Sequence, residues 1–169
     1  TPFSAGQPGD LQGARVLVVD DFAISGRSLA LRLQRCGFVA DTADCPAAAL
    51  SALHRAQMEK LPYRAVLIDH DLGECDGASL AQRIVEIPEN RGLALVICVA
   101  ADFRGDAQRL HEAGFAAYLH KPARQSVLQE GLLRVLAPRP ATKADPVSSP
   151  VVAEVARRPW RLLIVEDNA

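Results

Sequence analysis

The segment RVLVVDD, residues 15–21, decides the fold, because its apolar and largely β-branched run ends abruptly in two acids. An uninterrupted apolar run of this length is typical of a strand buried on both faces of a parallel sheet. Over residues 22–36 the apolar spacing becomes helical, with Leu29 and Leu33 on one stripe, and Gly37 follows as a typical helix stop. The segment therefore predicts a strand followed by a helix.

The same alternation of strand and helix recurs four more times along the chain. Strands that alternate with helices run parallel and are joined by right-handed crossovers, which places helices on both faces of one sheet. We expect an α/β fold, a three-layer sandwich around a parallel five-stranded sheet. The remaining strands are expected at 38–42, 64–68, 93–99 and 116–120, and the remaining helices at 46–57, 77–87, 104–113 and 124–136.

Composition and charge exclude several classes of protein. The 169 residues carry a net charge of -1, so the chain lacks the basic surface of a nucleic-acid-binding domain. The four cysteines show no CxxC spacing, which favours reduced thiols and a cytoplasmic location. No apolar stretch approaches the ~20 residues of a membrane span. We expect no nucleic-acid partner and no direct membrane contact for this segment.

Charged residues follow three of the expected strands. Asp20 and Asp21 come after the first, Asp69 after the third and Lys121 after the fifth. The carboxyl ends of parallel strands share one edge of the sheet, so these acids would repel one another unless a cation lies between them. The acids, with the backbone carbonyl of Asp71, suit Mg²⁺. Lys121 suits a phosphoryl oxygen, and an Asp carboxylate can itself be the nucleophile that forms an acyl phosphate.

Three motifs in this order and spacing carry a family resemblance: RVLVVDD at 15–21, AVLIDHDLGECDG at 65–77 and AYLHKP at 117–122. Together they resemble the receiver domain of two-component response regulators, over about residues 14–136. The resemblance implies a flavodoxin-like (βα)5 fold with strand order 2-1-3-4-5. It also implies a phosphoprotein of signal transduction that takes part in a phosphorelay.

By that resemblance, Asp69 is the phosphoacceptor and Lys121 contacts the phosphoryl group. Asp20 and Asp21 are the magnesium-binding acids, and Asp71 supplies a carbonyl ligand.

Two structural positions follow from the same resemblance, and two positions depart from it. Gly77 would provide the turn after the active-site loop, and Pro122 would follow Lys121 through a cis bond. Phe22 stands where a small or polar residue is common, and Gly73 replaces the usual proline.

The switch positions of the family form a further departure. Counting back from Lys121, the switch Thr or Ser falls on Val99, which has no hydroxyl, and is followed by the small Ala100. Tyr118 occupies the aromatic switch position. A hydrogen bond to a charged phosphoryl oxygen contributes ~1.5–3 kcal/mol, so its loss predicts altered coupling between phosphorylation and conformation.

The C-terminal part reads as a linker followed by a repeat of the first motif. Five prolines lie between residues 138 and 159, and LLIVEDN at 162–168 repeats the pattern of the first strand and its acids. We expect an extension at 1–13, a receiver at 14–137, a Pro-rich linker at 138–159 and the truncated first strand of a second receiver at 160–169.

Tandem receivers resemble the C-terminal part of a hybrid sensor histidine kinase. The implied partners are a histidine kinase core or a histidine phosphotransferase domain, and the second receiver of the same chain. The parent polypeptide would then be a hybrid histidine kinase, which can be anchored in a membrane. The fragment itself is expected not to be an enzyme.

Two other functions stay open at this point. The first is a pseudo-receiver that is not phosphorylated and acts as a docking or ligand-binding module, with strand-end acids such as Asp21 only capping helices. The second is a phosphatase of the haloacid dehalogenase type, suggested by Asp69-His70-Asp71 after an apolar strand, although Gly73 does not fit its motif and the N-terminal acids are left unexplained.

Overall fold

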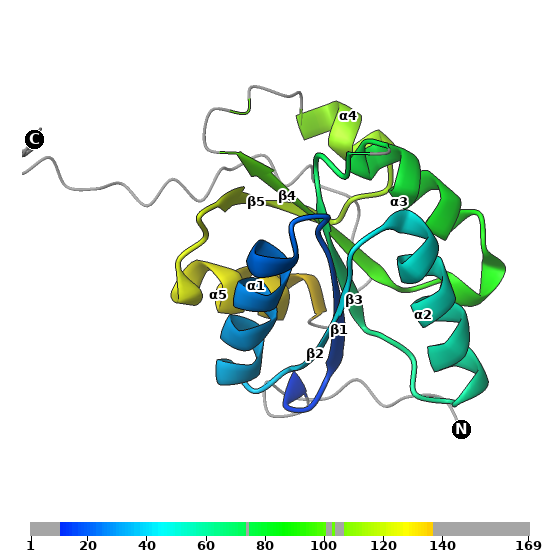
Figure 1. Cartoon of the computed structure of the whole chain (residues 1–169), viewed down its shortest axis with the longest axis horizontal. Helices are drawn as coiled ribbons and strands as arrows, with labels where there is room; N and C mark the ends of the chain where they lie inside the picture. The colour runs from blue at the N-terminus through cyan, green and yellow to red at the C-terminus, as the bar shows by residue number, and fades with distance from the viewer. Residues whose placement is uncertain (1–10, 74, 101–102, 104–106, 137–169) are drawn as a thin grey trace, which may run out of the picture. The chain divides into compact units, whose positions relative to one another are not determined.

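A computed structural model describes residues 11–73, 75–100, 103 and 107–136 of the chain. The described part holds one sheet of five parallel strands in the order β2-β1-β3-β4-β5, which confirms the expected flavodoxin-like topology (Figure 1). The elements in chain order are β1 (Arg15–Val19), α1 (Ala23–Arg35), β2 (Val39–Ala43), α2 (Pro46–Met58), β3 (Ala65–Asp69), α3 (Gly77–Val85), a 3₁₀ turn (Pro88–Asn90), β4 (Ala94–Ala100), α4 (Ala107–Glu112), β5 (Ala117–Lys121) and α5 (Gln125–Leu136).

Four of the strands begin and end one residue later than the sequence predicts. The apolar pattern ends β3 before Asp69 and β5 before Lys121, but the ladder includes both: Asp69 is in register with Cys98, and Lys121 with Ala100. A charged residue at the carboxyl edge can pair its backbone while its side chain leaves the apolar layer, so hydrophobicity alone misplaces this boundary. The two charged side chains are thus fixed by the sheet itself.

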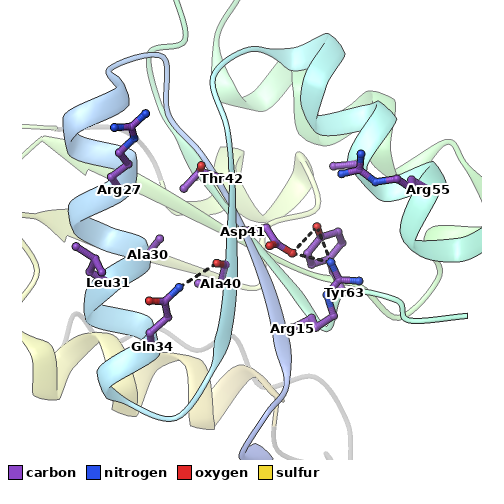
Figure 2. Close-up of a pocket in the computed structure, with 11 residues that line it drawn as sticks. Arg15, Arg27, Ala30, Leu31, Gln34, Ala40, Asp41, Thr42, Arg55 and Tyr63 are labelled. Carbon is purple, nitrogen blue, oxygen red and sulfur yellow. Dashed lines mark hydrogen bonds and ion pairs between the residues drawn. The ribbon is translucent and has the colours of Figure 1, made fainter. Parts of the chain in front are cut away.

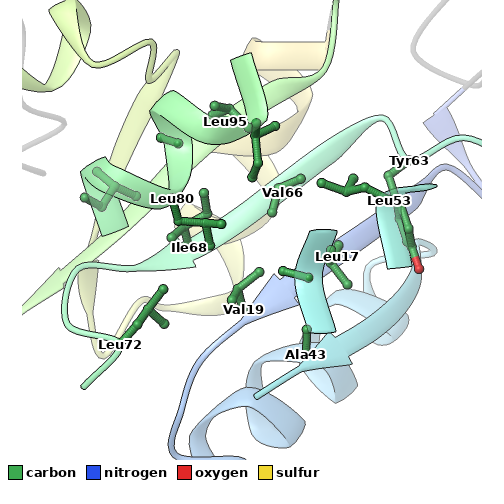
Figure 3. Close-up of a cluster of buried hydrophobic side chains, with 14 of the residues drawn as sticks. Leu17, Val19, Ala43, Leu53, Tyr63, Val66, Ile68, Leu72, Leu80 and Leu95 are labelled. Atoms are coloured by element: carbon green, nitrogen blue, oxygen red, sulfur yellow. The ribbon is translucent and has the colours of Figure 1, made fainter. Parts of the chain in front are cut away.

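Helices cover both faces of the sheet and give it two apolar layers. Helices α1 and α5 lie on one face, and α2 and α3 on the other (Figure 1). The layer against α2 and α3 includes Leu17, Val66, Ile68 and Leu80, all fully buried (Figure 3). A Leu or Ile side chain contributes ~1.5–3 kcal/mol when fully buried, so these layers hold the strand ends in place.

The start of α3 depends on Gly77. A Cβ at this position would collide with the backbone oxygen of Asp69 and would crowd Ile68. The nitrogen of Gly77 also donates to the His70 oxygen at 2.8 Å. The resemblance implied that Gly77 provides the turn after the active-site loop, and α3 does begin at this residue. Its φ lies outside the left-handed region, so the glycine is needed here for close approach.

Parts of the expected domain organisation lie outside the described residues. These parts are residues 1–10 of the N-terminal extension, residue 137, the linker at 138–159 and the segment at 160–169. The first three residues of the helix expected at 104–113 lie outside as well. Within the described ranges, no helix is both long and apolar enough to cross a membrane.

Candidate functional site

The carboxyl edge of the sheet brings together the charged residues that the sequence singles out. Asp20 follows β1, Asp69 ends β3 and Lys121 ends β5. Strand β4 lies between β3 and β5, so the Lys121 side chain reaches Asp69 across the end of β4. Small side chains there, Cys98 and Ala100, line the same pocket and leave room for this crossing.

Three carboxylates form a cluster suited to a divalent cation. One oxygen from each of Asp20, Asp21 and Asp69 lies within 4.8 Å of the others. Asp20 is 3% exposed, whereas Asp21 faces solvent. Two charges ~4 Å apart repel by several kcal/mol at intermediate dielectric, so a bound cation would reduce the repulsion between these carboxylates. The donor set therefore fits Mg²⁺, with Asp20, Asp21 and Asp69 as the residues that would hold it.

Lys121 is the counterion for two of these carboxylates. Its Nζ donates to Oδ2 of Asp20 at 2.7 Å and to Oδ2 of Asp69 at 2.8 Å. Partial burial tends to lower the pKa of Lys121, but the hydrogen bonds to Asp20 and Asp69 and their charges outweigh it, so the pKa is raised. The ammonium group is therefore held charged, next to one oxygen of Asp69. Asp69 Oδ1 has no hydrogen-bond partner among the described residues.

Ser25 belongs to the site, although the sequence interpretation did not include it. Its hydroxyl donates to Oδ2 of Asp20 at 2.6 Å and lies 3.5 Å from the Lys121 amine. Asp20 Oδ1 in turn accepts from the backbone nitrogen of Phe22 at 3.0 Å. Only Phe22 separates the two acids from the start of α1, so the first turn of the helix faces the pocket. A polar residue in this first turn could therefore have been expected to contact Asp20.

The loop after β3 is shaped by its own side chains. Asp71 Oδ1 accepts from the Gly73 nitrogen at 3.1 Å, and Asp76 caps α3 by accepting from the Ser79 nitrogen at 2.7 Å. Gly73 has φ +67, which proline cannot adopt, and a Cβ there would lie 3.1 Å from Asp21 Oδ2. This conformation explains why glycine stands where the family usually has proline. The Lys121–Pro122 bond is cis, as the resemblance implied.

Comparisons with known proteins agree with this geometry. The family model of the response regulator receiver domain matches residues 16–132, well over half of the chain. The chain belongs to the response regulator receiver family. It is a receiver domain of two-component signalling.

Two solved structures illustrate the similarity of this receiver domain. A putative response regulator from Chloroflexus aurantiacus is 27% identical, with a TM-score of 0.63, and the match covers 75% of this chain and 99% of that one. A sensor protein from Polaromonas is 27% identical, with a TM-score of 0.61, over 73% of this chain and 95% of that one. Both matches extend over nearly the full length of the solved chain.

A curated relative places a similar receiver in a much larger protein. The hybrid signal transduction histidine kinase L of Dictyostelium discoideum is 28% identical over 126 residues, which is 73% of this chain. The receiver spans only 7% of the length of that kinase.

The switch positions of the receiver lie on two different faces. Val99 is fully buried in the layer that faces α2 and α3, and Tyr118 packs against the same layer. Ala100, in contrast, lines the pocket beside Asp69 and Lys121. The pocket has a volume of about 610 Å³. Neither Val99 nor Ala100 offers it a hydroxyl.

Proposed function

We propose that this receiver domain accepts a phosphoryl group on Asp69 from a phosphohistidine of a partner protein. The observation that carries the proposal is the pairing of Lys121 with Asp69 Oδ2, which leaves Oδ1 without a hydrogen-bond partner among the described residues. An aspartate held in this way is oriented for attack, and the neighbouring ammonium can neutralise charge on the transferred group.

The transfer is a simple displacement at phosphorus. Asp69 Oδ1 forms the new P–O bond while the P–N bond to the donor imidazole breaks, and the imidazole leaves with the bonding electron pair. Lys121 lies beside the accepting carboxylate and can donate to a phosphoryl oxygen. Asp20, held by Ser25 and the Phe22 nitrogen, keeps its orientation throughout. Mg²⁺, when bound by Asp20, Asp21 and Asp69, supplies charge neutralisation for the phosphoryl oxygens.

The partner is proposed to be a histidine kinase core or a histidine phosphotransferase domain. Phe22 and Ile24, next to the acids at the start of α1, are 61% and 70% exposed. Apolar side chains beside a charged pocket supply contact area to a docking protein, while the pocket supplies the chemistry. The likeness to a hybrid histidine kinase supports a phosphorelay setting, and a cytoplasmic location follows from that setting as a proposal.

Signalling by this receiver is proposed to be atypical. The hydroxyl that would follow the phosphoryl group in a typical receiver is replaced by Val99, which is fully buried. Phosphorylation of Asp69 is then coupled less strongly to Tyr118, because one charge-assisted hydrogen bond is missing. The fragment itself is proposed to accept a phosphoryl group rather than to turn over a substrate.

Acetyl phosphate with Mg²⁺ tests the proposal by intact-mass measurement. We expect the full chain to gain the mass of one phosphoryl group, and Asp69→Asn to gain none. Asp71→Asn is the matched control, since we propose that Asp71 contributes its backbone carbonyl only; it should still be labelled.

The remaining functions give other results in the same assay. No mass gain in the native chain would contradict the proposal and favour a docking pseudo-receiver. Catalytic turnover of a generic phosphate ester that Asp71→Asn abolishes would indicate a haloacid-dehalogenase-type phosphatase.

A further inference from the structure

The outer edge of β2 carries backbone groups that have no strand partner among the described residues. β2 is an edge strand of the described sheet, with β1 as its neighbour. The Val39 nitrogen and the Ala43 oxygen bond toward the β1 side, to Ala14 and Asp20. Alternate residues of a parallel strand point their backbone groups to opposite sides, so Ala40 and Thr42 point outward. Among described residues, one weak contact occupies this edge: Gln34 Nε2 donates to the Ala40 oxygen at 3.4 Å.

A groove of about 530 Å³ runs along this edge (Figure 2). Arg27 on α1 and Arg55 on α2 line it from opposite sides of β2. Both side chains are exposed, and neither makes a hydrogen bond or salt bridge to a described residue. Two guanidinium groups thus flank the strand edge, and the described carboxylate of Asp41 acts on Arg55 through its charge only.

The groove carries a net positive charge because three arginines, Arg15, Arg27 and Arg55, line it with one acid, Asp41. Asp41 accepts from Arg15 at 2.6 Å and from the Tyr63 hydroxyl at 2.8 Å. Partial burial tends to raise the pKa of Asp41, but the hydrogen bonds from Arg15 and Tyr63 outweigh it and lower the pKa. The carboxylate is therefore charged, and its hydrogen bonds go to Arg15 and Tyr63. Arg27 and Arg55 therefore remain available to an anionic partner.

We propose that an extended acidic segment of a partner protein binds here by adding a strand to β2. A paired strand would satisfy the outward backbone groups of Ala40 and Thr42 and would displace the weak contact of Gln34 with the Ala40 oxygen. Side chains of an extended strand alternate between faces, so two consecutive acids would reach Arg27 and Arg55 together. A small anion could contact only one of these groups, since β2 lies between them (Figure 2). The surface is separate from the pocket around Asp69.

Fluorescence anisotropy with the full chain tests whether Arg27 and Arg55 attract an acidic peptide. The probe is a short labelled peptide rich in Val and Thr with Glu-Asp at its centre, and the comparison peptide carries Lys-Lys instead. We expect the acidic peptide to bind, to weaken with added salt, and to bind roughly tenfold more weakly to the double variant Arg27→Ala and Arg55→Ala. The matched control Arg83→Ala, on α3, should bind as the native chain does.

Amide hydrogen exchange tests the strand pairing. Binding of the acidic peptide should slow exchange at Ala40 and Thr42, and a peptide with proline at alternate positions should lose most of its affinity. The proposal is overturned if the acidic peptide fails to bind or if the proline peptide binds equally well. It is also overturned if inorganic phosphate displaces the probe and Arg27→Ala alone abolishes this displacement, because the site would then bind a small anion.

Discussion

Lys121 Nζ donates a 2.8 Å hydrogen bond to Asp69 Oδ2, although the two residues lie on β5 and β3 with β4 between them. The same amine binds Asp20 at 2.7 Å. One ammonium group thus compensates two carboxylates of the acidic cluster, and it does so by spanning the strand whose end carries the small Ala100. The charge balance of the pocket depends on this lysine until a cation binds.

Replacing Lys121 by Gln should destabilise the domain, and Mg²⁺ should restore part of the loss. Removing the ammonium leaves the partly buried carboxylates to repel, and we expect the free energy of unfolding to fall by about 1–3 kcal/mol. Urea titrations with and without Mg²⁺ measure this. Arg134→Gln, which removes an exposed ion pair with Glu130, is the control and should change stability by less than about 1 kcal/mol in either condition. A loss in Lys121→Gln that Mg²⁺ leaves unchanged would contradict the cation site.

Val99→Thr should cost stability in the resting domain and strengthen the response to phosphorylation. The new hydroxyl enters a fully buried apolar position, which costs ~1–3 kcal/mol where it finds no partner. Val99 faces the α2 and α3 layer in the resting domain, so we expect beryllium fluoride with Mg²⁺ to draw the new hydroxyl from this layer toward Asp69. The nuclear magnetic resonance shift of the Tyr118 amide should then change more than in the native chain. Equal shift changes in both proteins would show that Val99 does not limit the coupling.

Asp76→Ala should weaken the start of α3. The Asp76 carboxylate accepts from the Ser79 nitrogen and side chain, and these hydrogen bonds lower its pKa. Loss of an N-cap of this kind costs ~0.5–2 kcal/mol. Because the folded-state pKa is depressed, the contribution is present at neutral pH and is lost as the pH falls below about 4. Denaturant titrations at pH 7 and pH 3 should therefore show a gap between native chain and variant that narrows at the lower pH.

Alkaline pH should destabilise the native chain through Cys98. Complete burial raises the pKa of this thiol to about 12, although the Lys121 ammonium opposes the shift. The unfolded thiol titrates near pH 8.5, so stability is full below that pH and is lost as the pH rises toward 12. From pH 8 to pH 10 the loss is roughly 2 kcal/mol. Under reducing conditions, Cys98→Ala should lack this part of the loss; a constant gap between the two proteins would refute the assignment.

The fold could be predicted almost completely from the sequence, because apolar runs and helical spacing alternate without interruption. The boundaries at Asp69 and Lys121 could not, since a polarity pattern cannot show that a charged residue still pairs its backbone in the ladder. Gly77 was expected at the turn after the active-site loop, but the close approach of its backbone to Asp69 could not be seen from the sequence.

The candidate site was predicted as a set of residues but not as a network. The acids, Lys121 and the cis Lys121–Pro122 bond are where the motifs indicated. Ser25 was missed, because its role depends on the direction in which the first turn of α1 faces, and spacing alone does not give that direction. The pairing of one lysine with two carboxylates likewise required three-dimensional geometry. Phosphorylation, Mg²⁺ binding and the altered switch remain predictions.

The most direct test of the central claim is to locate the phosphoryl group after treatment with acetyl phosphate and Mg²⁺. Borohydride reduction converts an aspartyl phosphate to homoserine, and tandem mass spectrometry of the digested chain identifies the converted residue. We predict homoserine at position 69 and at no other aspartate, with none in Asp69→Asn. Conversion at Asp20, Asp21 or Asp71, or no conversion under conditions that label another receiver in parallel, would contradict the account.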